Sequence, residues 1–226
     1  MDFSPGQYDA LIQKIENGLN TAVSDANAAI SRIEGATSWI PGIGSAIKEA
    51  LDKFVSLMKE FMAKVGEALK WTQIPPTMWQ FGQTWLNLAT QAGQTAVNVK
   101  DLDSYSSQWQ GIAGGKYATG VAGQRPAVDT IQARCNQISG ACTGTAISGL
   151  AFYISVATTI IGLIIAIAGA ELVFPLVAGI ITAIVGLAGA VASLLIGVEG
   201  QARTFQQANE PSDSFPGNAW PQAVAP

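Results

Sequence analysis

Apolar residues recur at every third or fourth position through much of the chain, which is the spacing of one helix face. A first helix is predicted over residues 5–33, beginning with a capping serine and a proline at the first helical position. A proline and two glycines in residues 34–42 end it, and a second helix follows over residues 43–70. Five lysines nearly balance four acids in this helix, which favours a bundle helix over a basic membrane-surface peptide. The two helices form a predicted N-terminal segment, residues 1–76.

A second pair of helices is predicted within residues 77–140. The sequence WTQIPPT at residues 71–77 is interpreted as a linker, because neither proline suits a helix interior. A third helix then covers about residues 78–105. A fourth begins near residue 113 and contains Pro126, which should kink it or split it in two. No useful length of chain alternates as a strand does, so the predicted fold class is all-α, an amphipathic helical bundle.

The next segment, residues 141–200, is predicted to be a hydrophobic, transmembrane-capable helical hairpin. Residues 145–170 and 172–198 carry no charge, and Glu171 alone separates them. As a helix, either run extends about 39 Å, more than the roughly 30 Å hydrocarbon core of a bilayer. Pro175 lies where the second helix should start. The polar, proline-dotted remainder, residues 201–226, is predicted to be a flexible tail.

Small residues in the hairpin predict close packing between its helices. Helices in lipid associate through such contacts, because no hydrophobic force drives them together there. Membrane lipid is therefore an expected partner, although burial of the hairpin in a water-soluble form beforehand remains an alternative. The glycines concerned are Gly162 and Gly169 in the first run and Gly179 and Gly186 in the second.

The charges around the hairpin predict its orientation. Arg125 and Arg134 precede it and Arg203 follows it, whereas the tip carries only Glu171. Both long ends should therefore stay on one side of the membrane while the tip crosses. A carboxyl group crosses at lower cost when it is protonated, so insertion is expected to be easier in acid.

The composition argues against several classes of function. The net charge is −4, and no basic cluster is present to neutralise phosphates, which argues against nucleic-acid binding. The chain has no histidine, which removes His-based triads and most catalytic zinc sites. We therefore expect no enzyme activity, no cofactor and no metal site.

Two cysteines could form a disulfide only under one condition. Cys135 and Cys142 are seven residues apart, which places their Cα atoms about 10 Å apart in an unbroken helix, beyond disulfide reach. If the helix ends at Gly140, the two could pair. Both alternatives stay open at the level of sequence.

One motif points to a family. Trp109-Gln110-Gly111 lies between two predicted amphipathic helices, and the hairpin that they form resembles the WXG family of small helical proteins exported by type VII (ESX) systems. The resemblance implies that Trp109 and Gly111 form the turn. It also implies a helical WXG-like partner or self-association, and a location in the cell envelope or the medium. No tyrosine is followed four residues later by Asp or Glu, the usual export signal, so a partner would have to supply it.

These expectations combine into a non-enzymatic type VII secretion-associated protein that inserts its hydrophobic hairpin into a membrane, as a pore-forming or membrane-permeabilising effector. One alternative is a resident integral membrane protein with an accessory or immunity-type role. Another is a self-assembling structural protein of the cell surface.

Overall fold

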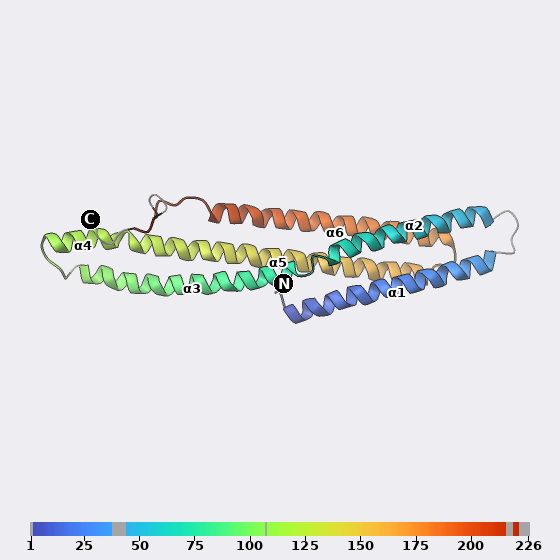
Figure 1. Cartoon of the computed structure of the whole chain (residues 1–226), viewed down its shortest axis with the longest axis horizontal. Coiled ribbons are helices and arrows are strands. Elements are labelled where there is room, and N and C mark those ends of the chain that lie inside the picture. Colours follow the sequence, from blue (N-terminus) through green and yellow to red (C-terminus); the bar gives the residue numbers. More distant parts are fainter. Residues whose placement is uncertain (1, 38–43, 107, 216–218, 222–226) are drawn as a thin grey trace. The chain divides into compact units, whose positions relative to one another are not determined.

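The computed structural model describes residues 2–37, 44–106, 108–215 and 219–221 (Figure 1). Every regular element in these ranges is a helix, which confirms the all-α prediction and its helical bundle. The helices are α1 (Pro5–Thr37), α2 (Gly44–Leu69), α3 (Ile74–Ser106), α4 (Ile112–Ala122), α5 (Gln124–Ala168) and α6 (Val173–Ala208).

The chain divides into two compact units, and each is built from segments that are distant in sequence. The first unit contains Met1–Pro76 and Ala146–Gly197, and the second contains Thr77–Thr145 and Val198–Pro226. The hydrophobic hairpin therefore shares a unit with the N-terminal helices, whereas the sequence predicts four consecutive segments.

The first unit is a four-helix arrangement of α1, α2, the second part of α5 and the first part of α6. Its largest buried side chains come from all four helices. Buried positions on α5 and α6 alternate in steps of three and four, the spacing with which helices pack along a shared seam. The core includes Tyr8, Ile15, Phe54, Phe61, Val65, Val156, Ile160, Leu163, Ile167, Leu176, Ile180 and Leu187.

Two tyrosines tie this unit together where α2 ends. The Tyr8 hydroxyl donates to the carbonyl oxygen of Thr72 at 2.8 Å, and the Tyr153 hydroxyl donates to that of Ala68 at 2.7 Å. The two rings meet edge to face, with centroids 5.6 Å apart. The Tyr153 hydroxyl thus bonds an oxygen of the last turn of α2, and the Tyr8 hydroxyl bonds one in the turn that follows this helix.

The turn between α2 and α3 is shorter than the predicted linker. Helix α3 begins at Ile74, so Pro75 and Pro76 lie in its first turn. The first N–H groups of a helix have no intrahelical acceptor, and proline therefore costs little there. The expectation that both prolines lie in a linker was wrong, because it considered only the helix interior.

The second unit contains most of α3, all of α4, the first part of α5 and the end of α6. Helices α4 and α5 meet at Gly123, and Pro126 lies in the first turn of α5, which confirms the predicted split. Helix α3 packs closely on α5. The Ser139 hydroxyl donates to the Gly82 carbonyl at 2.8 Å, and a Cβ added at Gly82 would lie 2.8 Å from the Thr143 hydroxyl oxygen.

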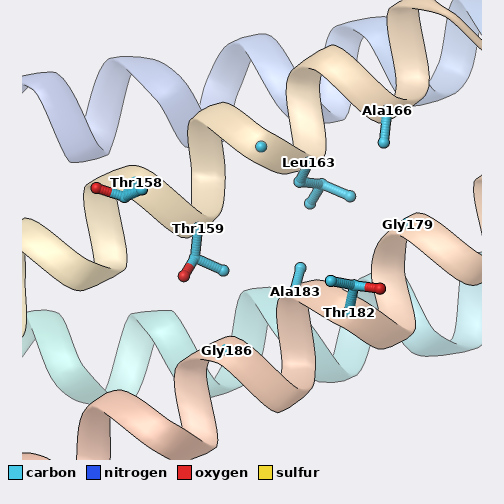
Figure 2. Close-up of a pocket in the computed structure, with 9 residues that line it drawn as sticks. Thr158, Thr159, Leu163, Ala166, Gly179, Thr182, Ala183 and Gly186 are labelled. Carbon is cyan, nitrogen blue, oxygen red and sulfur yellow. The ribbon is translucent and has the colours of Figure 1, made fainter.

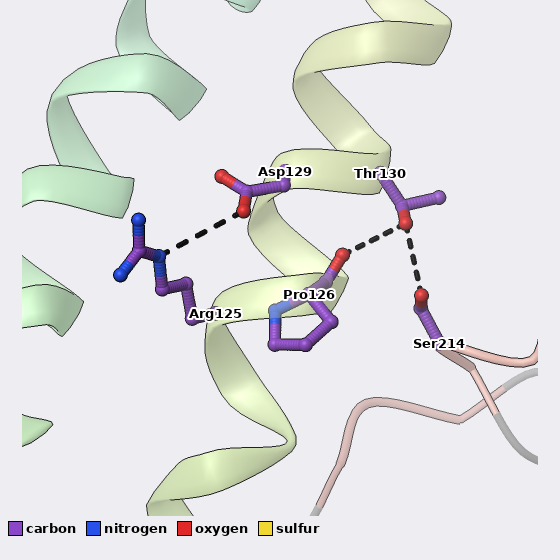
Figure 3. Close-up of polar contacts among 5 residues, drawn as sticks. All are labelled: Arg125, Pro126, Asp129, Thr130 and Ser214. Atoms are coloured by element: carbon purple, nitrogen blue, oxygen red, sulfur yellow. Dashed lines mark hydrogen bonds and ion pairs between the residues drawn. The ribbon is translucent and has the colours of Figure 1, made fainter.

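Helix α6 continues to Ala208 and so includes the first eight residues of the predicted tail. The Arg134 guanidinium donates to the Ala208 carbonyl at 2.7 Å and so satisfies an oxygen at the end of α6. Further along, the Ser214 and Thr130 hydroxyls are hydrogen-bonded at 2.9 Å, as Figure 3 shows beside the Arg125–Asp129 ion pair. These hydrogen bonds from α5 hold the segment from Ala208 to Ser214, which has few apolar side chains to bury.

Candidate functional site

The charge-free runs form a helical hairpin, as predicted. Its arms are the second part of α5 and the first part of α6, and Glu171 lies exposed in the tip between them. Pro175 is the third residue of α6, in the first turn. Both helices are long and apolar enough to cross a bilayer.

One side of each arm exposes large apolar residues to solvent. In the most apolar window of α4–α5 and of α6, only 44% and 22% of the residues are buried, so neither is an ordinary core helix. On α5 and over the first part of α6 the exposed residues recur at steps of seven and four, which places them along one side of each helix, and Leu195 and Ile196 continue that side of α6. We call this set the outer face: Ile154, Ile161 and Ile165 on α5, and Phe174, Ile181, Val185, Leu195 and Ile196 on α6.

The predicted glycines divide into two groups. A Cβ added at Gly179 would lie 2.8 Å from the Ala166 Cβ, and one at Gly186 would lie 3.2 Å from the Thr159 hydroxyl oxygen. These two glycines therefore permit the close approach of α6 to α5. A Cβ at Gly162 would meet no atom within 4 Å, and one at Gly169 would meet only the Ile165 carbonyl oxygen, at 3.4 Å. Neither lies at a close helix contact.

A cavity of about 420 Å³ lies between the two arms (Figure 2). Figure 2 shows Thr159 and Leu163 of α5 pointing toward Ala183 on α6. The threonine hydroxyls around it are satisfied within their own helices. Thr158 and Thr159 donate to carbonyl oxygens four residues earlier at 2.9 and 2.8 Å, and Thr182 does so at 2.9 Å. This bonding lets a hydroxyl enter an apolar environment without an unsatisfied donor.

The two cysteines are buried and free. Helix α5 runs unbroken from Gln124 to Ala168, so Gly140 does not end it and the condition for a disulfide is not met. Within the described ranges, no group of three or more histidine, cysteine or acidic residues could hold a metal ion.

The Trp-x-Gly turn lies between α3 and α4. Gly111 caps α4 with φ 85° and ψ −170°, a conformation that is essentially restricted to glycine. The Trp109 indole is 60% exposed and stacks on the Tyr117 ring at a centroid distance of 5.5 Å. A Cβ added at Gly114 would lie 2.5 Å from the Trp109 carbonyl oxygen, so this buried glycine lets the turn close.

Gly114 and Tyr117 are not among the turn residues that the sequence predicts. Their positions three and six residues after Gly111, on the helix that begins at the turn, are the feature that could have indicated them.

No protein-family model matches the chain, and no curated protein or solved structure matches it either. The resemblance to the WXG family therefore depends on the Trp-x-Gly motif and its place between α3 and α4.

Replacing Gly111 with alanine should destabilise the protein. An alanine held at this φ and ψ costs about 1–3 kcal/mol. The matched control is Gly115→Ala, because position 115 is helical, exposed and without a neighbour within 4 Å of the added Cβ. That change should stabilise the helix by up to about 1 kcal/mol. Urea unfolding followed by circular dichroism measures both, and equal stabilities of the two variants would contradict the assigned turn geometry.

Proposed function

We propose that this chain inserts the α5–α6 hairpin into a lipid bilayer and acts as a non-enzymatic, membrane-permeabilising helical protein. The observation that carries the proposal is the outer face, a row of exposed large apolar side chains on two helices without charges along the run. Contiguous exposed apolar surface of this kind marks a site for a membrane or a protein partner.

The energetics are sufficient for transfer of the outer face from water into lipid. Moving a fully exposed side chain of this size out of water contributes about 1.5–3 kcal/mol. The outer face has eight partly exposed side chains, so its transfer contributes on the order of 10 kcal/mol. A single charge at the bilayer centre costs about 3 kcal/mol. The gain exceeds the cost of carrying Glu171 across.

We further propose that the protein reaches its membrane through a type VII secretion system, with a helical WXG-like partner or a second copy of itself. The support is the Trp109-Gln110-Gly111 turn between two helices, with the Gly111 conformation that such a turn requires. Trp109 and Ile112 expose most of their side chains beside this turn, which suits a partner that packs there. The cell envelope or the medium is the expected location.

Placing a charge on the outer face should prevent insertion without affecting the fold. Val185 is 65% exposed, so Val185→Lys should leave the stability in water almost unchanged. A lysine near the middle of a membrane helix costs about 3 kcal/mol, so binding to phosphatidylcholine vesicles should fall by at least roughly tenfold. Gln206→Lys adds the same charge on α6 beyond the apolar run, and it should bind as the wild type does. Vesicle flotation measures the bound fraction, and unchanged binding of Val185→Lys would refute the proposal.

Neutralising the hairpin tip should remove a pH dependence of insertion. Glu171 is exposed, and no ion pair holds it among the residues with described positions. A carboxyl group crosses a bilayer at lower cost when it is protonated, so dye release from vesicles should be faster at pH 5 than at pH 7.5 for the wild type. Glu171→Gln should be fast at both pH values. If the variant and the wild type show the same pH profile, the carboxyl group is not the barrier to crossing.

Removing the turn tryptophan should impair export. Trp109→Ala should lower the fraction of the chain found in the medium of a host with a type VII system, because the proposed partner surface loses its largest ring. Trp71→Ala is the control, since Trp71 is equally exposed but lies in the turn before α3. Retention of the wild type in the inner membrane would instead favour the alternative of a resident membrane protein.

A further inference from the structure

The side of the hairpin opposite the outer face is also apolar, but it is covered. Its residues recur at steps of three, four and seven and are almost fully buried in the first unit. We call them the inner face: Val156, Ile160, Leu163 and Ile167 on α5, and Leu176, Ile180 and Leu187 on α6. A helix that is apolar on all sides suits lipid as well as a protein core. The inner face can therefore exchange its protein cover for acyl chains.

The cover consists of α1 and α2, which are amphipathic. Their outer sides are polar, as the half-exposed Glu60–Lys64 ion pair at 3.3 Å illustrates. Part of the face that α1 buries is made of small residues, namely Gly18, Ala22, Ala26 and Ala29. A Cβ added at Gly18 would lie 2.9 Å from the Ile160 Cγ2 atom, so α1 lies directly on α5. Small side chains bury little apolar area each, so this stretch of α1 holds the hairpin less strongly than the large buried side chains of α1 and α2 do.

A groove open to the surface runs between the two covering helices. It has a volume of about 330 Å³ and lies between Val23, Ala26 and Ile30 of α1 and Phe54, Met58 and Met62 of α2. Side chains that line a groove contact fewer protein atoms than side chains in a filled core. The contact between α1 and α2 is therefore less extensive along this groove.

Hydrogen bonds from two tyrosines lie at the junction of the cover and the hairpin. The Tyr153 hydroxyl of α5 donates to the Ala68 carbonyl at the end of α2, while the Tyr8 hydroxyl of α1 donates to the Thr72 carbonyl in the turn that follows. Tyr8 thus joins the two ends of the cover, and Tyr153 joins the cover to α5. Burial raises the pKa of Tyr8, so its hydroxyl keeps the proton that it donates.

We propose that α1 and α2 form an autoinhibitory clamp on the inner face, fastened by the Tyr153–Ala68 hydrogen bond, and that the hairpin enters a bilayer only when this clamp lifts away from α5. This inference rests on the proposed membrane insertion and adds its regulation. Before insertion the clamp keeps the inner face out of water. After it, the polar outer sides of α1 and α2 stay in contact with water or lipid headgroups.

A reversible crosslink between α1 and α5 tests the clamp. The full chain would carry Gly18→Cys and Ile160→Cys, with Cys135→Ala and Cys142→Ala removing the native thiols. The Cβ atoms at positions 18 and 160 are within about 4.5 Å, a span that a disulfide bridges, and Ile160→Cys removes the crowding Cγ2 atom. Insertion into phosphatidylcholine vesicles is followed by flotation and by dye release, for the oxidised and the reduced form of the same preparation.

The oxidised form should insert at least roughly tenfold more slowly than the reduced form, and a reducing agent added to the vesicles should restore insertion. Equal rates for the two forms would overturn the clamp while leaving membrane insertion intact. If the reduced form and the wild type both fail to insert, the proposed function itself is wrong, and the proposed clamp is wrong as well.

Tyr153→Phe provides a second test that needs no crosslink. It removes only the fastening hydroxyl, and insertion should become roughly fivefold faster. Thr119→Val likewise removes a single hydroxyl, from an exposed residue of α4 outside the first unit, and should insert at the wild-type rate. Hydrogen exchange without vesicles gives an independent readout, in which the amides of α1 and α2 should exchange faster in Tyr153→Phe. Unchanged exchange and unchanged insertion would overturn the fastening role.

Discussion

The structure depends on one constraint, which is the need to cover a hairpin that is apolar on every side. Residues 145–198 contain a single charge, at the tip, so neither helix has a polar side to present to water. The first unit supplies two further helices, and these bury the inner face. The outer face stays exposed. Much of what we infer about this protein follows from that imbalance between apolar surface and available cover.

The hydrogen bonds within the hairpin are compatible with transfer of the hairpin from water into a lipid bilayer. Thr158, Thr159 and Thr182 donate to their own helices, so these side chains need neither water nor a partner helix. Throughout the part of the chain that the structure describes, no buried side-chain nitrogen or oxygen lacks a partner. By contrast, the bond from Tyr153 to Ala68 joins two helices and is lost if they separate. The threonine hydroxyls of the hairpin are therefore satisfied within their own helices, whereas the Tyr153 hydroxyl is satisfied by a different helix, α2.

The site could be predicted in part. Absence of charge and sufficient length are properties of consecutive residues, so the hairpin, Glu171 at its tip and Pro175 at the start of α6 were all placed from sequence. The same holds for Gly111, because a tight turn between helices requires a residue that tolerates positive φ. The sequence did not show which of the hairpin glycines lie at close helix–helix contacts. Gly179 and Gly162 both occupy small-residue positions, but only Gly179 touches the opposite arm, because the rotation of each helix about its axis is set by all its neighbours.

The sequence by itself determined the helices, since a 3.6-residue period, capping residues and charge-free length all act within one element. It misplaced boundaries wherever a distant contact or a helix terminus decided them, as at Pro75 and at the extension of α6 to Ala208. Only the tertiary structure decided that the N-terminal helices cover the hairpin, and on which side. Burial depends on two surfaces that meet, and nothing in the sequence around Gly18 or Ile160 indicates that these two residues are in contact.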